Sequence, residues 1–215
     1  MADREVPGFL LCNGASLAWH DLNQLDGIPT MGVNVSWRFY RATWHTALDS
    51  EHFDSGSMNE WIYDYDDAHI FTLPERARGT KFPRIRKPTP SSPEWSWDPP
   101  TGVYARFSGM FALQVLVWLG ANRVWILGMD GMNHPGQGGH CYPPNKPVAS
   151  SLAGAHNAHL RMILPEVRAR GVEFWTCAKP TAIDAVPYME YDEAIVEARR
   201  MLCEHPLPFP LSSGN

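Results

Sequence analysis

The sequence predicts an α/β protein, a Rossmann-like three-layer sandwich whose sheet is mostly parallel. Short apolar runs alternate with segments of helical period, as they do in βαβ units. The chain has 215 residues, of which 44% are hydrophobic, and that is enough for one domain with a sizeable core. Internal repeats and heptad runs are absent from the sequence. Residues 1–215 are therefore interpreted as a single domain.

The predicted strands are short, apolar and bounded by polar residues or glycine. Six runs fit this description: residues 9–12, 30–34, 43–49, 68–73, 124–127 and 172–177. Helical segments or long connections separate most of them, so we expect crossover connections, which make neighbouring strands parallel.

Four helical segments lie between or after these strands. Ser16 is the predicted N-cap of a short helix over residues 17–25. Residues 110–119 are apolar on nearly every face, which predicts a helix buried between the sheet and a further layer. A longer helix is expected over residues 151–170, and an amphipathic one over residues 192–203.

Two long connections are predicted to be lid-like loops. Residues 74–100 hold seven prolines and a basic stretch from Arg76 to Lys87, and residues 132–150 are rich in glycine and proline. Loops of this length inside a compact domain are usually lids or binding loops.

Charge and hydropathy exclude several classes of protein. Lys and Arg number 18 against 23 Asp and Glu, a net charge of −5, which argues against a polyanion bound by the whole chain. Residues 1–5 lack a signal pattern and the densest apolar run is too short for a bilayer. We expect a cytoplasmic protein without a membrane span. Scattered cysteines predict reduced thiols: Cys12, Cys141, Cys177 and Cys203.

Polar or small residues lie at the ends of the predicted strands, at the edge where parallel sheets bind ligands. They are Asn13 and Gly14, Asn34, Asp49, and the run Gly128, Met129, Asp130 and Gly131.

Two of these positions, and two predicted helix starts, have a chemical interpretation. Glycine at position 14 lets a ligand approach the backbone, and the helix starts at Ser16 and at Ser108 with Gly109 offer N–H groups that suit a phosphate. Asp130 is a candidate catalytic residue; it could bind ribose hydroxyls or a metal, or it could form an Asx turn.

Several histidines and one acidic motif raise the question of a metal site. The nine histidines include His134, His140 beside Cys141, and the pair His156 and His159, but no three ligands have a known zinc spacing. Asp64-Tyr65-Asp66 matches the Asp-x-Asp signature of many sugar transferases but precedes its strand. We predict no obligatory cofactor, with Mg²⁺ or Mn²⁺ left open.

Five segments form an ordered set along residues 9–131: Asn13-Gly14-Ala15-Ser16-Leu17, Gly32-Val33-Asn34, and residues 108–114, 119–121 and 125–131. The first is similar to the GNGPSL opening of the bacterial sialyltransferases of glycosyltransferase family 42. The last three resemble the SGxxAlxxAlxLG…IyLxGxD core of that family. The set is equally similar to 6-hydroxymethylpterin pyrophosphokinase-like proteins, and the Trp-rich chain resembles phage-encoded proteins of this kind.

The resemblance implies a Rossmann-like protein that binds cytidine or a similar nucleotide without an obligatory metal. It assigns phosphate and ribose to Asn13, Ser16 and Asn34. It assigns the nucleotide or the transferred sugar to Ser108 and Gly109, and the cytidine part to Asp130 and Gly131.

The resemblance also implies a general base, and the sequence differs from the sialyltransferases at two positions. Counting back from the strand near residue 173 puts the family's general-base histidine near His156. Asp49 stands where the sialyltransferases carry Asn, and Tyr142 is the only nearby candidate for their paired tyrosines.

Three functions therefore stand as hypotheses. The first is a glycosyltransferase that moves a sugar from a nucleotide-sugar donor, with CMP-linked donors as one class, to a hydroxyl acceptor. The second is a Mg²⁺-dependent pyrophosphokinase or nucleotide-processing enzyme, whose metal would be held by Asp49, Asp130 and Asp64 to Asp67. The third is a nucleotide- or DNA-binding module that uses Arg76 to Lys87. The acceptor and the oligomeric state, a homo-oligomer included, stay open.

Overall fold

Six parallel strands form one sheet in the computed structural model of the chain, in the order β4-β3-β2-β1-β5-β6. Residues 4–48, 70–71, 95–98, 103–104, 106–136, 138–141, 149 and 151–206 are described. The strands are β1 (Pro7–Leu11), β2 (Thr30–Val33), β3 (Trp44–Thr46), β4 (Ile70–Phe71), β5 (Arg123–Leu127) and β6 (Glu173–Thr176). Every neighbouring pair is parallel. The predicted α/β fold is confirmed.

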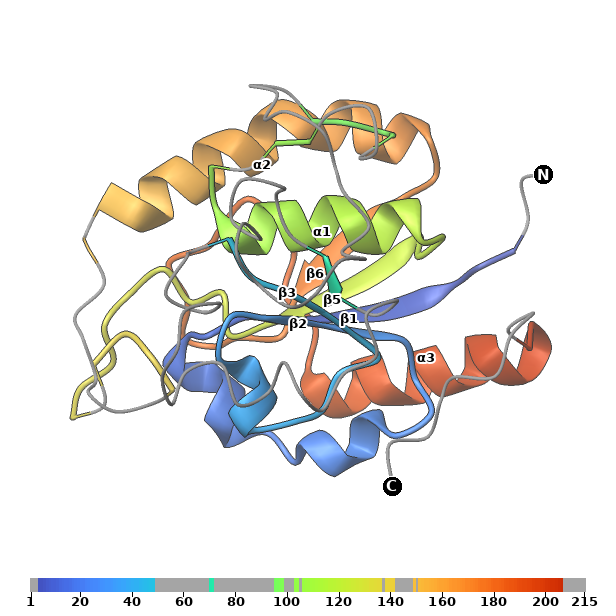
Figure 1. Cartoon of the computed structure of the whole chain (residues 1–215), viewed down its shortest axis with the longest axis horizontal. Coiled ribbons are helices and arrows are strands. Elements are labelled where there is room, and N and C mark those ends of the chain that lie inside the picture. The colour runs from blue at the N-terminus through green and yellow to red at the C-terminus, as the bar shows by residue number, and fades with distance from the viewer. Residues whose placement is uncertain are drawn as a thin grey trace, which may run out of the picture.

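Helices cover both faces of the sheet, which is why the strands are apolar without alternation. The α-helices are α1 (Ser108–Trp118), α2 (Ser151–Ala169) and α3 (Tyr191–Glu204). One core cluster joins the sheet to α1 and α2, and a second joins its other face to α3. In Figure 1, α1 lies between α2 and the sheet. Its apolar surface is buried on several sides, as its sequence predicts.

An aromatic row on the α3 face fixes the register of three strands. Phe9, Trp125 and Trp175 are register partners on β1, β5 and β6. Their rings stack with centroids 5.2 and 5.7 Å apart. Cross-strand contacts between aromatic rings stabilise a sheet beyond the area they bury.

The segment after β1 differs from the prediction. Instead of one helix over residues 17–25, two 3₁₀ helices form, η1 (Ala15–Trp19) and η2 (Leu22–Leu25), and a third, η3 (Ser36–Arg38), follows β2. The chain is extended at His20, and the Asp21 side chain accepts a hydrogen bond from the Asn23 N–H at the start of η2. Ser16 is not an N-cap, because it lies inside η1 and binds a distant carboxylate.

Of the predicted lid-like loop over residues 74–100 only residues 95–98 are described, and the basic stretch from Arg76 to Lys87 lies outside the described residues. Of the predicted loop over residues 132–150, residues 132–136, 138–141 and 149 are described. The cysteines are free thiols, as predicted. No helix in the described part of the chain is long and apolar enough to cross a bilayer.

Candidate functional site

A cleft of about 270 Å³ lies at the carboxyl edge of the sheet, between the ends of β1 and β5. The strand order reverses at this point, because β1 has β2 on one side and β5 on the other. Open parallel sheets bind ligands at such a switch point. Nine of the predicted site residues line the cleft: Asn13, Gly14, Asn34, Ser108, Gly109, Gly128, Asp130, Gly131 and His156.

The remaining predictions have other outcomes. Ser16 is buried and does not line the cleft, and Asp49 and Tyr142 lie outside the described residues. The structure adds Arg106 and His140 to the lining. Arg106 could have been found from the sequence, because a cation directly before a helix N-terminus favours an anion site.

Gly14 holds the loop after β1 against the loop after β5. Its N–H donates to the Gly128 carbonyl oxygen at 2.6 Å. A Cβ at position 14 would lie 2.5 Å from the same oxygen and 2.7 Å from the Asp130 carboxylate. Only glycine permits this close approach.

Asp130 joins the loop after β5 to the segment after β1. Its side chain is buried, and its Oδ2 accepts hydrogen bonds from the Ser16 N–H at 2.8 Å and from His134 Nε2 at 2.9 Å. The Ser16 hydroxyl donates to Oδ1. Both donors of Ser16 are thus used inside the protein, so any contribution of Ser16 to ligand binding is indirect. The sequence pattern did not predict this bridging role of Asp130.

The N-terminus of α1 opens into the cleft at Ser108 and Gly109. Phe107 is the N-cap residue and gives no side-chain hydrogen bond to the first turn. Arg106 is exposed at the same end, with its guanidinium 5.5 Å from the Phe107 ring. A helix dipole and a guanidinium together make this end of the cleft positive and suited to an anionic group.

Asn34 presents its side chain from an unusual backbone conformation. Its φ is 51°, in the left-handed region. Its N–H donates to the Thr46 carbonyl oxygen at 2.8 Å, and its carbonyl oxygen accepts from His45 Nε2 at 2.8 Å. The buried Oδ1 atoms of Asn34 and Asn13 have no partner among the described residues. Two residues that line the cleft therefore each carry an amide acceptor without a protein partner among the described residues.

Two substitutions separate the backbone requirement of Asn34 from its side chain. We expect Asn34→Ala to lower the free energy of unfolding by about 1–2 kcal/mol and Asn34→Gly to change it by less than about 1 kcal/mol, because glycine tolerates positive φ. Because the sequence motifs assign a nucleotide to this cleft, we expect both substitutions to weaken nucleotide binding about tenfold, the value of one hydrogen bond. Chemical denaturation and nucleotide titration measure the two effects. Binding at the wild-type level in both variants would show that the Asn34 side chain does not contribute to ligand binding.

His156 stands on the second turn of α2 across the cleft from these groups. It is 8% exposed, and its ring meets Phe107 edge-on with centroids 4.5 Å apart. Burial, and next the neighbouring His159, lower the pKa of His156 to about 4. Its imidazole is neutral near pH 7 and can accept a proton.

His159 is a second neutral imidazole on the same helix. It stacks on Tyr104 with ring centroids 3.8 Å apart. Burial, and next the positive charge of Arg106, lower its pKa. It does not line the cleft.

No metal centre is formed by the described residues, within which no group of three or more His, Cys, Asp or Glu side chains could hold an ion. The acidic segment Asp64 to Asp67 lies outside them.

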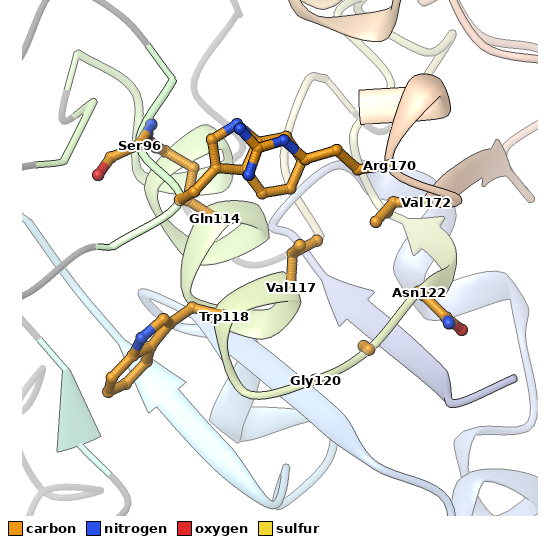
Figure 2. A pocket seen from close by; sticks show the side chains of 10 residues that line it. Ser96, Gln114, Val117, Trp118, Gly120, Asn122, Arg170 and Val172 are labelled. Atoms are coloured by element: carbon orange, nitrogen blue, oxygen red, sulfur yellow. Dashed lines mark hydrogen bonds between the residues drawn. The ribbon is translucent and has the colours of Figure 1, made fainter. Parts of the chain in front are cut away.

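A second cavity, of about 300 Å³, lies at the opposite end of the sheet, where α1 ends and β5 begins (Figure 2). Trp97, Trp118 and Arg170 line it. The Arg170 guanidinium lies 4.2 Å from the Trp97 ring, whose indole N–H donates to Glu166. None of the predicted site residues lines this cavity, so we place the functional site in the first cleft.

Comparisons of the chain with protein-family models, curated proteins and solved structures find no match. The chemistry of the cleft and the motifs that line it are thus the basis for assigning a function.

Proposed function

We propose that the protein is a glycosyltransferase that moves a sugar from a nucleotide-sugar donor to a hydroxyl acceptor, with His156 as the general base. One observation carries the proposal. Asn13, Asn34 and Ser108, which the sequence motifs assign to the donor, line one cleft together with a neutral histidine from a distant helix. A CMP-linked sugar is one donor class that the motifs favour.

The two ends of the cleft suit the two parts of a nucleotide. The phosphate would lie at the N-terminus of α1 beside Arg106, the exposed cation of the lining. Ribose hydroxyls would donate to the Oδ1 atoms of Asn13 and Asn34, which lack other partners among the described residues. Backbone N–H groups that are already oriented stabilise the charge that grows on a departing phosphate, and they need no reorganisation to do so.

The transfer step uses the neutral form of His156. The acceptor oxygen bonds to the anomeric carbon of the sugar as the bond between that carbon and the phosphate oxygen breaks. The electron pair of the broken bond stays on the phosphate, and the acceptor proton moves to the imidazole. A positioned base of this kind contributes about 10²–10⁴-fold to a rate.

A thermal-shift panel of nucleotides and nucleotide sugars, with and without chelator, tests the proposal. A donor at 100 times its Kd stabilises the native state by about 2.7 kcal/mol, which for a chain of this size raises Tm by about 5–10 °C. We expect one donor family to give this shift and to support sugar transfer in chelator, and Arg106→Ala to reduce the shift.

Two results of that panel would contradict the proposal. The first is an absence of any shift with every nucleotide. The second is activity that chelator abolishes, which would favour the hypothesis of a Mg²⁺-dependent pyrophosphokinase with the same fold.

A further inference from the structure

Residues 181–185 form a loop segment after β6, which we call the strap. Hydrogen bonds join the strap to Asp130, beyond the end of β5, and to Asn157 on α2. The Asp130 carbonyl oxygen accepts hydrogen bonds from the Ala182 N–H at 2.8 Å and from the Thr181 hydroxyl at 3.1 Å. The same Thr181 oxygen accepts from the Ile183 N–H at 3.0 Å. The strap is therefore fixed at its first residues to the segment that also holds the loop after β1.

Asn157 joins the other side of the strap to α2. Its Nδ2 donates to the Ala182 carbonyl oxygen at 2.8 Å. Its Oδ1 accepts from the N–H groups of Asp184 and Ala185 at 3.0 and 3.1 Å. The side chain is 6% exposed. An amide supplies both a donor and an acceptor here, so Asp, Leu or Ala would each leave a buried backbone group without a partner.

His156, the next residue toward the N-terminus, lacks the usual means of orientation. A catalytic imidazole is commonly held by a hydrogen bond from its second nitrogen to a carboxylate or carbonyl oxygen. The Nδ1 atom of His156 is buried and has no partner among the described residues. The orientation of the His156 ring is therefore set by the position of the α2 backbone and by the contact of the ring with Phe107.

We infer that Asn157 is a positioning residue that sets the place of His156 in the cleft by anchoring the second turn of α2, through the strap, to Asp130. The donor side and the base side of the cleft are thereby tied to one residue, because Asp130 also binds Ser16 in the loop after β1. The inference rests on the proposed function only in so far as His156 is the base of the reaction.

The test compares Asn157→Ala with Asn122→Ala in the full chain. Asn122 is a matched control, because its amide also joins two segments, through the Val6 N–H at 2.8 Å and the Arg4 carbonyl oxygen at 2.9 Å, but at the far end of the sheet. The first readout is the titration of the His156 imidazole by NMR, which needs no substrate. The second is the separate effect on kcat and on the KM for the donor.

We expect Asn157→Ala to move the His156 titration upward by one pH unit or more, toward that of an exposed imidazole. It should lower kcat about 10–100-fold with KM changed less than threefold, since misplacement of a catalytic group by 1 Å can cost 10²-fold. Asn122→Ala should lower Tm without either effect. Thr181→Val, which loosens the same strap from outside α2, should shift the titration in the same direction if Asn157→Ala does not fold.

An unmoved His156 titration in the variants of the strap would overturn the inference, even if they are destabilised. The failure of the proposed function is a different result: the titration would still move, but no donor would be turned over by the wild-type chain.

Discussion

Replacing His156 by alanine is expected to lower turnover by about two to four orders of magnitude while leaving nucleotide affinity within about twofold. The imidazole is neutral near pH 7, because burial holds the pKa of His156 at about 4. Because the donor groups lie on other elements, removal of the ring should leave the donor site intact. Steady-state kinetics and a nucleotide titration measure the two quantities.

The pH dependence of the reaction gives a second test of the same residue. A base must be unprotonated, so kcat/KM should be constant near neutrality and fall as the pH drops through the pKa of about 4, instead of through 6.5. His159→Gln is the matched control, because it changes a buried imidazole one turn away that does not line the cleft. It should keep turnover within about threefold and move the acid limb of the pH profile to higher pH, since His159 contributes to lowering the pKa of His156.

Unaltered turnover in His156→Ala would exclude His156 as the base.

Replacing Asp130 by alanine is expected to lower the free energy of unfolding by about 2–4 kcal/mol, and Tm by about 5–15 °C. The substitution leaves three buried donors without their acceptor: the N–H and the hydroxyl of Ser16, and the Nε2 of His134. An unsatisfied buried donor costs about 1–3 kcal/mol. Denaturant unfolding followed by tryptophan fluorescence measures the loss.

Asp26 offers a matched control for Asp130. It is exposed and accepts one hydrogen bond, from the Tyr40 hydroxyl at 3.0 Å. Asp26→Ala should change the free energy of unfolding by less than about 0.5 kcal/mol. If Asp130→Ala were as mild as this control, the buried carboxylate would not be what holds the loops together.

The sequence identifies the strands and most of the helices because their signals are local. An apolar run such as residues 124–127 predicts a buried strand wherever it lies in the chain. Once the strands are parallel, their polar ends must share one edge, so the meeting of Asn13, Asn34 and Gly128 in one cleft also follows from pattern and topology. The N-terminus of α1 at Ser108 is predicted from the sequence too, because a long apolar run begins directly after Ser108 and Gly109.

Other features depend on partners that are remote in sequence. The sequence predicts Ser16 as a local N-cap. In the structure, its N–H and its hydroxyl donate to Asp130, which is 114 residues away. The strap that joins Asn157 to Ala182 is equally invisible to local periodicity.

What the sequence alone determined is the α/β class, the order of the elements and the edge at which the polar residues gather, because backbone geometry and apolar spacing encode these properties locally. What only the tertiary structure decided is which polar groups are bonded to one another, which lack a partner among the described residues, and that burial keeps His156 neutral. Burial and hydrogen bonding arise from segments that meet after folding, so neither the free acceptors nor the lowered pKa can be read from the residues one at a time.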